Sequence, residues 1–92
     1  MILFFELELK LAYTNSLKEK RNILKSMLEK IKRRYNVSVI ESDAQDNINR
    51  SRLSFVLISL YQNNAVSQMQ EILQFIEENY EVEVIDIIKE FL

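Results

Sequence analysis

Three acidic residues, Glu41, Asp43 and Asp46, lie close enough along the chain to form a site for a magnesium ion. Carboxylate oxygens are ligands that Mg²⁺ prefers in proteins, so carboxylate chemistry, with or without this metal, is the catalytic class that the sequence leaves open. These acids lie in a polar, turn-like segment, however, where Asp side chains often bond their own backbone. We therefore predict no metal site, no cofactor and no catalytic residue.

The residue types that are missing exclude most other reactions. The 92 residues contain no histidine, no cysteine and no glycine. This excludes Ser-His and Cys-His nucleophile pairs, a glycine-rich phosphate loop, a disulfide and the usual ligands of zinc. Without glycine or proline, turns must rely on Asn, Asp and Ser, which tolerate a left-handed backbone best among the other types. We predict a binding protein and not an enzyme.

A second group of residues, the cations Lys18, Lys20 and Arg21, stands at the start of a predicted helix. Ser16 and Glu19 have the spacing of a capping box, in which the serine hydroxyl accepts from the Glu19 N–H and the Glu19 carboxylate reaches back. Capping leaves the cations unexplained, because exposed, unpaired cations at a helix start oppose the helix dipole by about 0.3–1 kcal/mol each. The helix start is therefore a candidate site for an anion.

Lys20 has an unusual position within this helix. On a helical wheel at about 100° per residue, it falls inside the apolar stripe. A lysine there must either extend past the edge of the sheet or meet an acid. In the fold predicted below, the helix start and the end of the second strand lie at the same end of the sheet. We therefore predict that Lys20, or Arg21 beside it, pairs with Glu41, Asp43 or Asp46.

Charge is divided unevenly along the chain. Residues 17–35 contain eight basic and two acidic residues, whereas the remainder contains four basic and twelve acidic ones. This asymmetry has two interpretations: an electrostatic surface for phosphate or nucleic acid, or a solvated helix face that the acidic remainder balances. Under the first interpretation, the residues predicted to bind the anion or nucleic acid are Lys18, Lys20, Arg21 and Lys25.

The hydrophobic pattern predicts the elements that position these residues. Alternation and β-branched runs indicate strands at 2–13, 37–41, 52–61 and 81–88, and helical periodicity indicates helices at 17–35 and 65–80. A break at 14–16, a polar loop at 42–51 and a turn at 62–64 separate them. The order βαββαβ predicts an α+β, ferredoxin-like, two-layer sandwich, with a four-stranded antiparallel sheet and two helices on one face. Residues 1–92 form a single domain.

The uncovered face of this sheet is predicted to be partly apolar. The segment 52–61 has apolar residues on both faces of the predicted strand. In an antiparallel sheet with one solvated face, apolar and polar residues should alternate along the strand. Val56, Ile58 and Ile87 would then form an exposed apolar patch, which indicates self-association or a partner. A homo-oligomer is therefore one predicted state.

Nothing in the sequence indicates a membrane or an exported protein. No apolar run approaches the roughly 18 residues of a membrane-spanning helix. The first ten residues lack a basic n-region, and acidic residues interrupt their apolar run, so they make a poor signal peptide. We expect a cytoplasmic protein.

Several stretches resemble those of a known family. They are SLKEKR at 16–21, RRYNVSV at 33–39 and ESDAQD at 41–46, followed by Arg50, and they are similar to the YlxP-like family of small bacterial proteins. The resemblance covers nearly the whole chain and implies a ferredoxin-like fold. The family is a domain of unknown function whose genes often lie among translation factors, which implies a connection with RNA or the ribosome. The sequence departs from the family at Ala44, where histidine is common.

Together these observations favour a non-enzymatic binding module that contacts RNA or the ribosome through the basic helix 17–35. The alternative is a structural or regulatory module that self-associates through the open sheet face. A base-stacking platform on that face is disfavoured, because the outward carboxylates Glu6 and Glu8 would repel phosphate.

Overall fold

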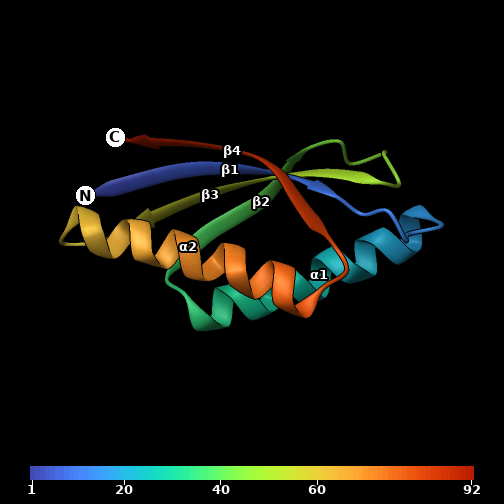
Figure 1. Ribbon diagram of the computed structural model, residues 1–92, viewed down its shortest axis with the longest axis horizontal. Coiled ribbons are helices and arrows are strands. Elements are labelled where there is room, and N and C mark those ends of the chain that lie inside the picture. The colour runs from blue at the N-terminus through green and yellow to red at the C-terminus, as the bar shows by residue number, and fades with distance from the viewer.

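Strands and helices alternate in the order β1, α1, β2, β3, α2, β4 in the computed structural model, which describes residues 1–92 (Figure 1). The elements are β1 Ile2–Lys10, α1 Leu17–Arg34, β2 Val37–Asp43, β3 Arg50–Ile58, α2 Gln62–Asn79 and β4 Glu83–Phe91. The four strands form one antiparallel sheet in the order β2-β3-β1-β4, and both helices lie on the same side of it. The predicted α+β, ferredoxin-like fold is confirmed.

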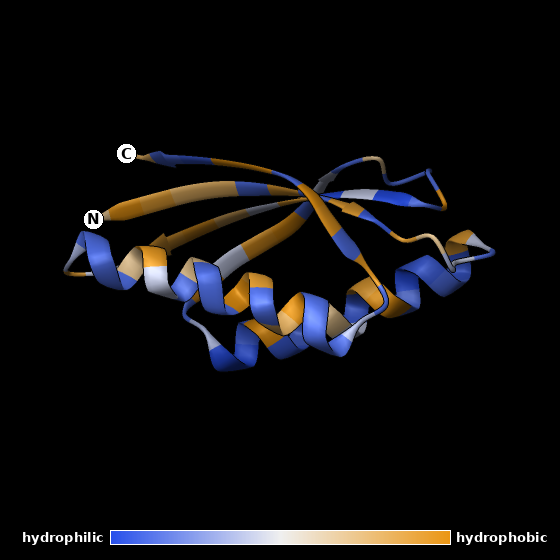
Figure 2. Cartoon of the chain, viewed as in Figure 1, coloured by the Kyte–Doolittle hydropathy of each residue, from blue (hydrophilic) through white to orange (hydrophobic).

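Alternation along the two central strands builds the core. Leu3, Phe5, Leu7 and Leu9 of β1 are fully buried against the helices, and the residues between them face outward. Phe5 pairs with Phe55 of β3, and their rings stack with centroids 4.4 Å apart. Figure 2 shows that the strands are mainly hydrophobic at the end that carries both termini and more hydrophilic at the other end.

The predicted boundaries of the strands are wrong by a few residues. β1 ends at Lys10 and not at residue 13, because its antiparallel neighbours begin at Arg50 and Glu83, directly opposite Lys10. β2 continues to Asp43 through an irregular pairing with β3, so the predicted loop 42–51 shrinks. β4 continues to Phe91, which lies opposite Leu3.

The second helix also begins earlier than predicted. Residues 62–64, which were predicted to form a turn, form the first turn of α2. Tyr61 occupies the N-cap position without a side-chain hydrogen bond to the helix. Asn and Gln disfavour a helix only by up to about 0.7 kcal/mol each, and burial of Ala65 and Met69 against the sheet outweighs that cost.

A β-bulge in β4 reverses the predicted orientation of Ile87. Glu8 lies opposite Asp86 while Leu9 lies opposite Val84, so Ile85 is an extra residue in the ladder. Ile87 is therefore opposite the buried Leu7 and shares its face, which is the helix side of the sheet. The predicted grouping of Ile87 with Val56 and Ile58 on the outer face is wrong, although all three are exposed.

No helix of the structure is long and apolar enough to cross a membrane.

Candidate functional site

The start of α1 is held by its own side chains, much as the sequence predicted. The Glu19 N–H donates to Ser16 Oγ at 3.1 Å, which is the first half of a capping box. The second half differs, because the Glu19 carboxylate accepts from the Asn15 N–H at 3.3 Å instead of from Ser16. This capping satisfies a free backbone donor at the helix start but neutralises none of the neighbouring cations.

Lys20 is fully buried beneath the segment that joins β2 and β3. Its Nζ lies 3.0 Å from Glu41 Oε2 and donates to the carbonyl oxygens of Ala44 and Asn47, both at 2.6 Å. An ammonium group has three donors, and these three acceptors use all of them. Of the pairings predicted for Lys20, the one with Glu41 forms. Lys20 is not available to an outside anion, so its place in the predicted anion-binding set is wrong.

Glu41 is the centre of this buried polar cluster. It lies opposite the buried Leu53, on the helix side of the sheet, and its Oε2 also accepts from the hydroxyl of buried Ser51 at 2.6 Å. Every buried side-chain nitrogen and oxygen in the molecule has a hydrogen-bond partner. The cluster is therefore a satisfied structural clamp between α1 and the β2–β3 loop.

The other two acids predicted beside Glu41 do not join it. Asp43 lies 3.8 Å from Arg52, with both side chains well exposed, and it also accepts from the Ala44 N–H. Asp46 forms no ion pair. The three carboxylates do not converge, and no group of three or more metal-ligating side chains occurs in the structure. The magnesium site considered from the sequence thus has no geometric basis.

The β2–β3 loop reaches Lys20 through an unexpected residue. Ala44 has a φ of 61°, in the left-handed region, where Asn, Asp or Ser was predicted. Its carbonyl oxygen accepts from Lys20 Nζ and from the Asn47 N–H at 3.0 Å. A left-handed backbone costs a residue with a Cβ about 1–2 kcal/mol, and the buried lysine contacts offset that cost.

The remaining cations of α1 are all exposed and unpaired. The structure contains two ion pairs, and Lys20 is the only residue of α1 in either of them. The helix therefore presents seven cations to solvent without a carboxylate within 4.0 Å: Lys18, Arg21, Lys25, Lys30, Lys32, Arg33 and Arg34. Glu41 of β2 neutralises the buried cation, and no acid pairs with the exposed ones.

Four of these cations form a row along one side of the helix. At about 100° per residue, Lys18, Arg21, Lys25 and Lys32 lie within about 60° of one another on the helical wheel. We call this row the basic flank. Lys32 was missing from the predicted set, which ended at Lys25. Its seven-residue spacing from Lys25 was the signal that would have placed it in the row.

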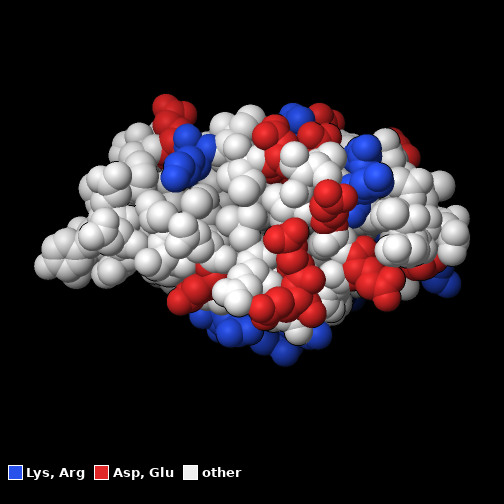
Figure 3. Space-filling model, viewed as in Figure 1, with Lys and Arg blue, Asp and Glu red and all other residues white.

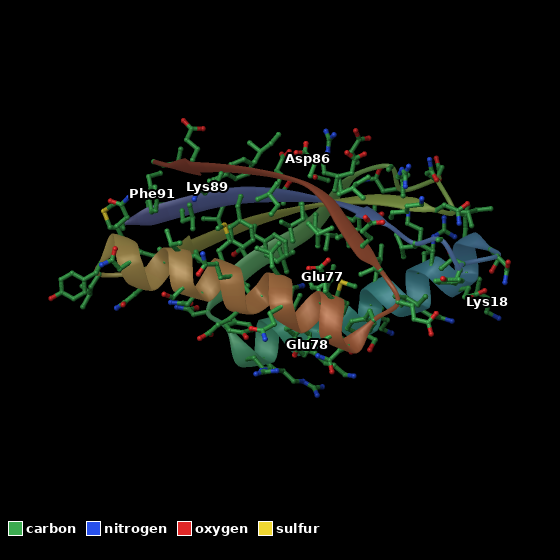
Figure 4. The ribbon with its side chains drawn as sticks, viewed as in Figure 1. Lys18, Glu77, Glu78, Asp86, Lys89 and Phe91 are labelled. Carbon is green, nitrogen blue, oxygen red and sulfur yellow. The ribbon has the colours of Figure 1, made fainter.

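The basic flank points away from α2. The opposite side of α1 contacts α2 and the segment after it: Ser26 shares a hydrogen bond of 3.0 Å with Tyr80, and the Arg34 guanidinium lies 5.0 Å from the ring centroid of Phe75. The flank therefore runs along the outer side of the molecule, beside the edge strand β2, over which α1 packs. Figure 4 shows Lys18 at the start of α1, at the far end of the molecule from both termini.

The opposite side of the molecule is acidic. Residues 62–92 contain seven acidic residues and one basic residue. Figure 3 shows basic atoms gathered along the lower edge, where α1 lies, and acidic atoms above them, near the end of α2. The largest hollow, of about 770 Å³, lies on this side and is lined by Glu77, Glu78, Glu81 and Glu83. Positive charge is therefore concentrated on the α1 side of the molecule.

Three comparisons relate the chain to known proteins. The model of one family, described as a protein of unknown function (DUF503), matches residues 2–88. The uncharacterized protein YlxP of Bacillus subtilis (strain 168) is 34% identical over 83 residues, which cover 90% of each chain. Among solved structures, the de novo designed protein Ferredog-Diesel aligns with 99% of this chain and 85% of its own, with a TM-score of 0.49 and 13% identity.

Proposed function

The chain belongs to the DUF503 family of proteins of unknown function, as its resemblance to the YlxP-like family predicted, and we propose that it is a non-enzymatic module that binds RNA, free or within the ribosome. The observation that carries this proposal is the basic flank: four exposed cations in one row, none of them paired. A partner with a row of phosphates is the ligand that such a surface fits.

The cations of the basic flank are free to bind the phosphates of another molecule. Binding breaks no existing ion pair, so the flank loses no internal contact when it meets phosphate. Each phosphate that a cation neutralises releases condensed counterions, which makes binding favourable at low salt. Lys18 and Arg21 also stand where the helix dipole repels cations, and a phosphate beside them relieves that repulsion. The acidic opposite side orients the protein, because it repels the same polyanion.

Salt-dependent binding to a ribosomal RNA fragment tests this proposal. Four phosphate contacts predict a slope of about −3.6 for log K against log salt, since each contributes about −0.9 on a duplex. The double variant Arg21→Glu/Lys25→Glu removes two contacts, so its slope should fall by about half. Fluorescence anisotropy at several salt concentrations measures both slopes.

The matched control is Lys30→Glu/Arg33→Glu. It makes the same change in net charge on the same helix but outside the basic flank. If binding followed net charge alone, both double variants would weaken it equally. That result, or salt-independent binding by the unaltered protein, would remove the flank as the RNA-binding surface.

A second candidate function is self-association through the outer face of the sheet. Ile58 is 62% exposed and lies opposite Ile2, which is 39% exposed, while Val56, at 41%, lies opposite Phe4. These outward residues form a continuous apolar area near the two termini, where another copy of the chain would cover it. Light scattering should show an oligomer that Ile58→Glu dissociates and that Ile87→Glu, on the other face, leaves intact. A monomer at high micromolar concentration would remove this candidate.

A further inference from the structure

We infer that the RNA which the basic flank takes is base-paired, and that the protein contacts the paired backbone and not unstacked bases. This inference rests on the proposed function and adds the class of RNA to it. It follows from three features of the flank: the side chains that it has, those that it lacks, and its rigidity.

The flank has no aromatic side chain on which a base could stack. Proteins that bind single strands combine a basic groove with stacked aromatic residues, each worth about 1–3 kcal/mol per base. Every tyrosine here lies elsewhere. Tyr80 is hydrogen-bonded to Ser26 on the opposite side of α1, Tyr35 packs against the core, Tyr13 lines the acidic hollow, and Tyr61 precedes α2.

The flank also lacks a pocket for a base that leaves its stack. None of the five main hollows is lined by Lys18, Arg21, Lys25 or Lys32. Sequence-specific recognition of single-stranded RNA requires space beside the backbone for splayed bases. A convex row of cations on a helix provides no such space. Such a row can recognise only the charge and the shape of the RNA backbone.

Rigidity is the third feature. The cations are carried by a continuous helix, and at 1.5 Å per residue the row from Lys18 to Lys32 is about 21 Å long. The first of these residues follows the Ser16 cap, and the buried Lys20 clamp fixes the same turn to the sheet. A stiff row of charges binds best to a partner whose phosphates are already held in place, because ordering a flexible strand costs conformational entropy. Double-stranded RNA is recognised in this way, through phosphates and overall shape.

The test compares a duplex of about 16 base pairs with one of its own strands, at equal strand length and equal salt. We expect the duplex to bind about tenfold or more tightly, a difference of about 1.4 kcal/mol. This preference should disappear in Arg21→Glu/Lys25→Glu and persist in Lys30→Glu/Arg33→Glu. Circular dichroism of each variant shows that it is folded.

The outcomes separate the inference from the proposed function. Binding of the single strand that equals or exceeds binding of the duplex overturns the inference while leaving an RNA-binding flank. A duplex preference that both double variants retain also overturns it, because the preference would then not arise at the flank. Failure to bind either RNA overturns the proposed function itself.

Discussion

The first turn of α1 presents two opposite environments to three neighbouring cations. Lys20 is fully buried, and Glu41, Ala44 and Asn47 accept from all of its donors. Lys18 and Arg21, within two residues of it, are exposed and have no ion-pair partner. The same residue types at nearly the same place in the sequence thus belong to a structural clamp and to a free surface.

The difference lies in angular position on the helix. Lys20 is turned about 200° from Lys18 and about 100° from Arg21, so it points to the sheet and the others point away. A cation enclosed by protein requires a partner, because an unpaired buried charge is very costly. A cation in water has no such requirement and remains free for a ligand. Proximity in sequence is therefore a poor guide to the role of a charge.

The largest expected effect comes from removing the buried cation. Lys20→Met keeps the bulk of the side chain but leaves the Glu41 carboxylate without a counter-charge and the Asn47 carbonyl without a donor. The free energy of unfolding should therefore fall by about 3–5 kcal/mol. Arg21→Met, the exposed control, should change it by less than about 0.5 kcal/mol. Urea denaturation measures both values.

The pairing itself can be tested by a second substitution. Adding Glu41→Gln to Lys20→Met removes the unpaired charge while keeping an acceptor for Ser51, so part of the lost stability should return. If the two changes were additive, or if Lys20→Met cost no more than Arg21→Met, the contrast between the buried and exposed cations would be wrong.

A smaller effect is expected at the loop that encloses Lys20. Ala44→Gly removes the cost of a left-handed alanine, about 1–2 kcal/mol, but adds about 0.4–1 kcal/mol of chain entropy to the unfolded state. The free energy of unfolding should therefore rise by up to about 1.6 kcal/mol, at roughly 4–8 °C in Tm per kcal/mol for a domain of this size. Thermal unfolding followed by circular dichroism measures the shift. A lower Tm would contradict the idea that Ala44 is strained for the sake of the clamp.

The smallest effect on stability is expected at the exposed cations, and it is again a gain. Lys18→Gln removes a charge that the helix dipole disfavours, so the free energy of unfolding should rise by about 0.3–1 kcal/mol. The same change should weaken RNA binding, because the basic flank loses a cation. Urea denaturation and fluorescence anisotropy together would then show that Lys18 lowers stability but strengthens RNA binding. A variant that is both less stable and equally able to bind would contradict this expectation.

Local patterns were sufficient to predict much of the architecture. Alternation in β1 predicted which side chains are buried, and Ser16 with Glu19 predicted the helix cap. The anomaly of Lys20 could also be seen, since its position in an apolar stripe requires an acid nearby. Each of these inferences depends on residues a few positions apart, where helix and strand geometry is nearly fixed.

The wrong predictions concern features that depend on contacts between segments far apart in the sequence. The orientation of Ile87 depends on a bulge in the pairing of β4 with β1, which alternation within β4 does not reveal. That the basic flank points away from α2 follows only from the contacts that Ser26 and Arg34 make on the other side of α1. Likewise, Ala44 adopts its left-handed conformation within a loop that closes over a lysine 24 residues away.

The order of the elements, the cap of α1 and the concentration of positive charge on that helix could be read from the amino-acid sequence, because they follow from periodicity and composition. Which cations are neutralised and which remain free depends on contacts that exist only in the folded protein. Neutralisation requires a carboxylate within a few ångströms, and Glu41 reaches Lys20 only when β2 folds back beside the start of α1. The free charge of the basic flank is what remains after that long-range pairing is made.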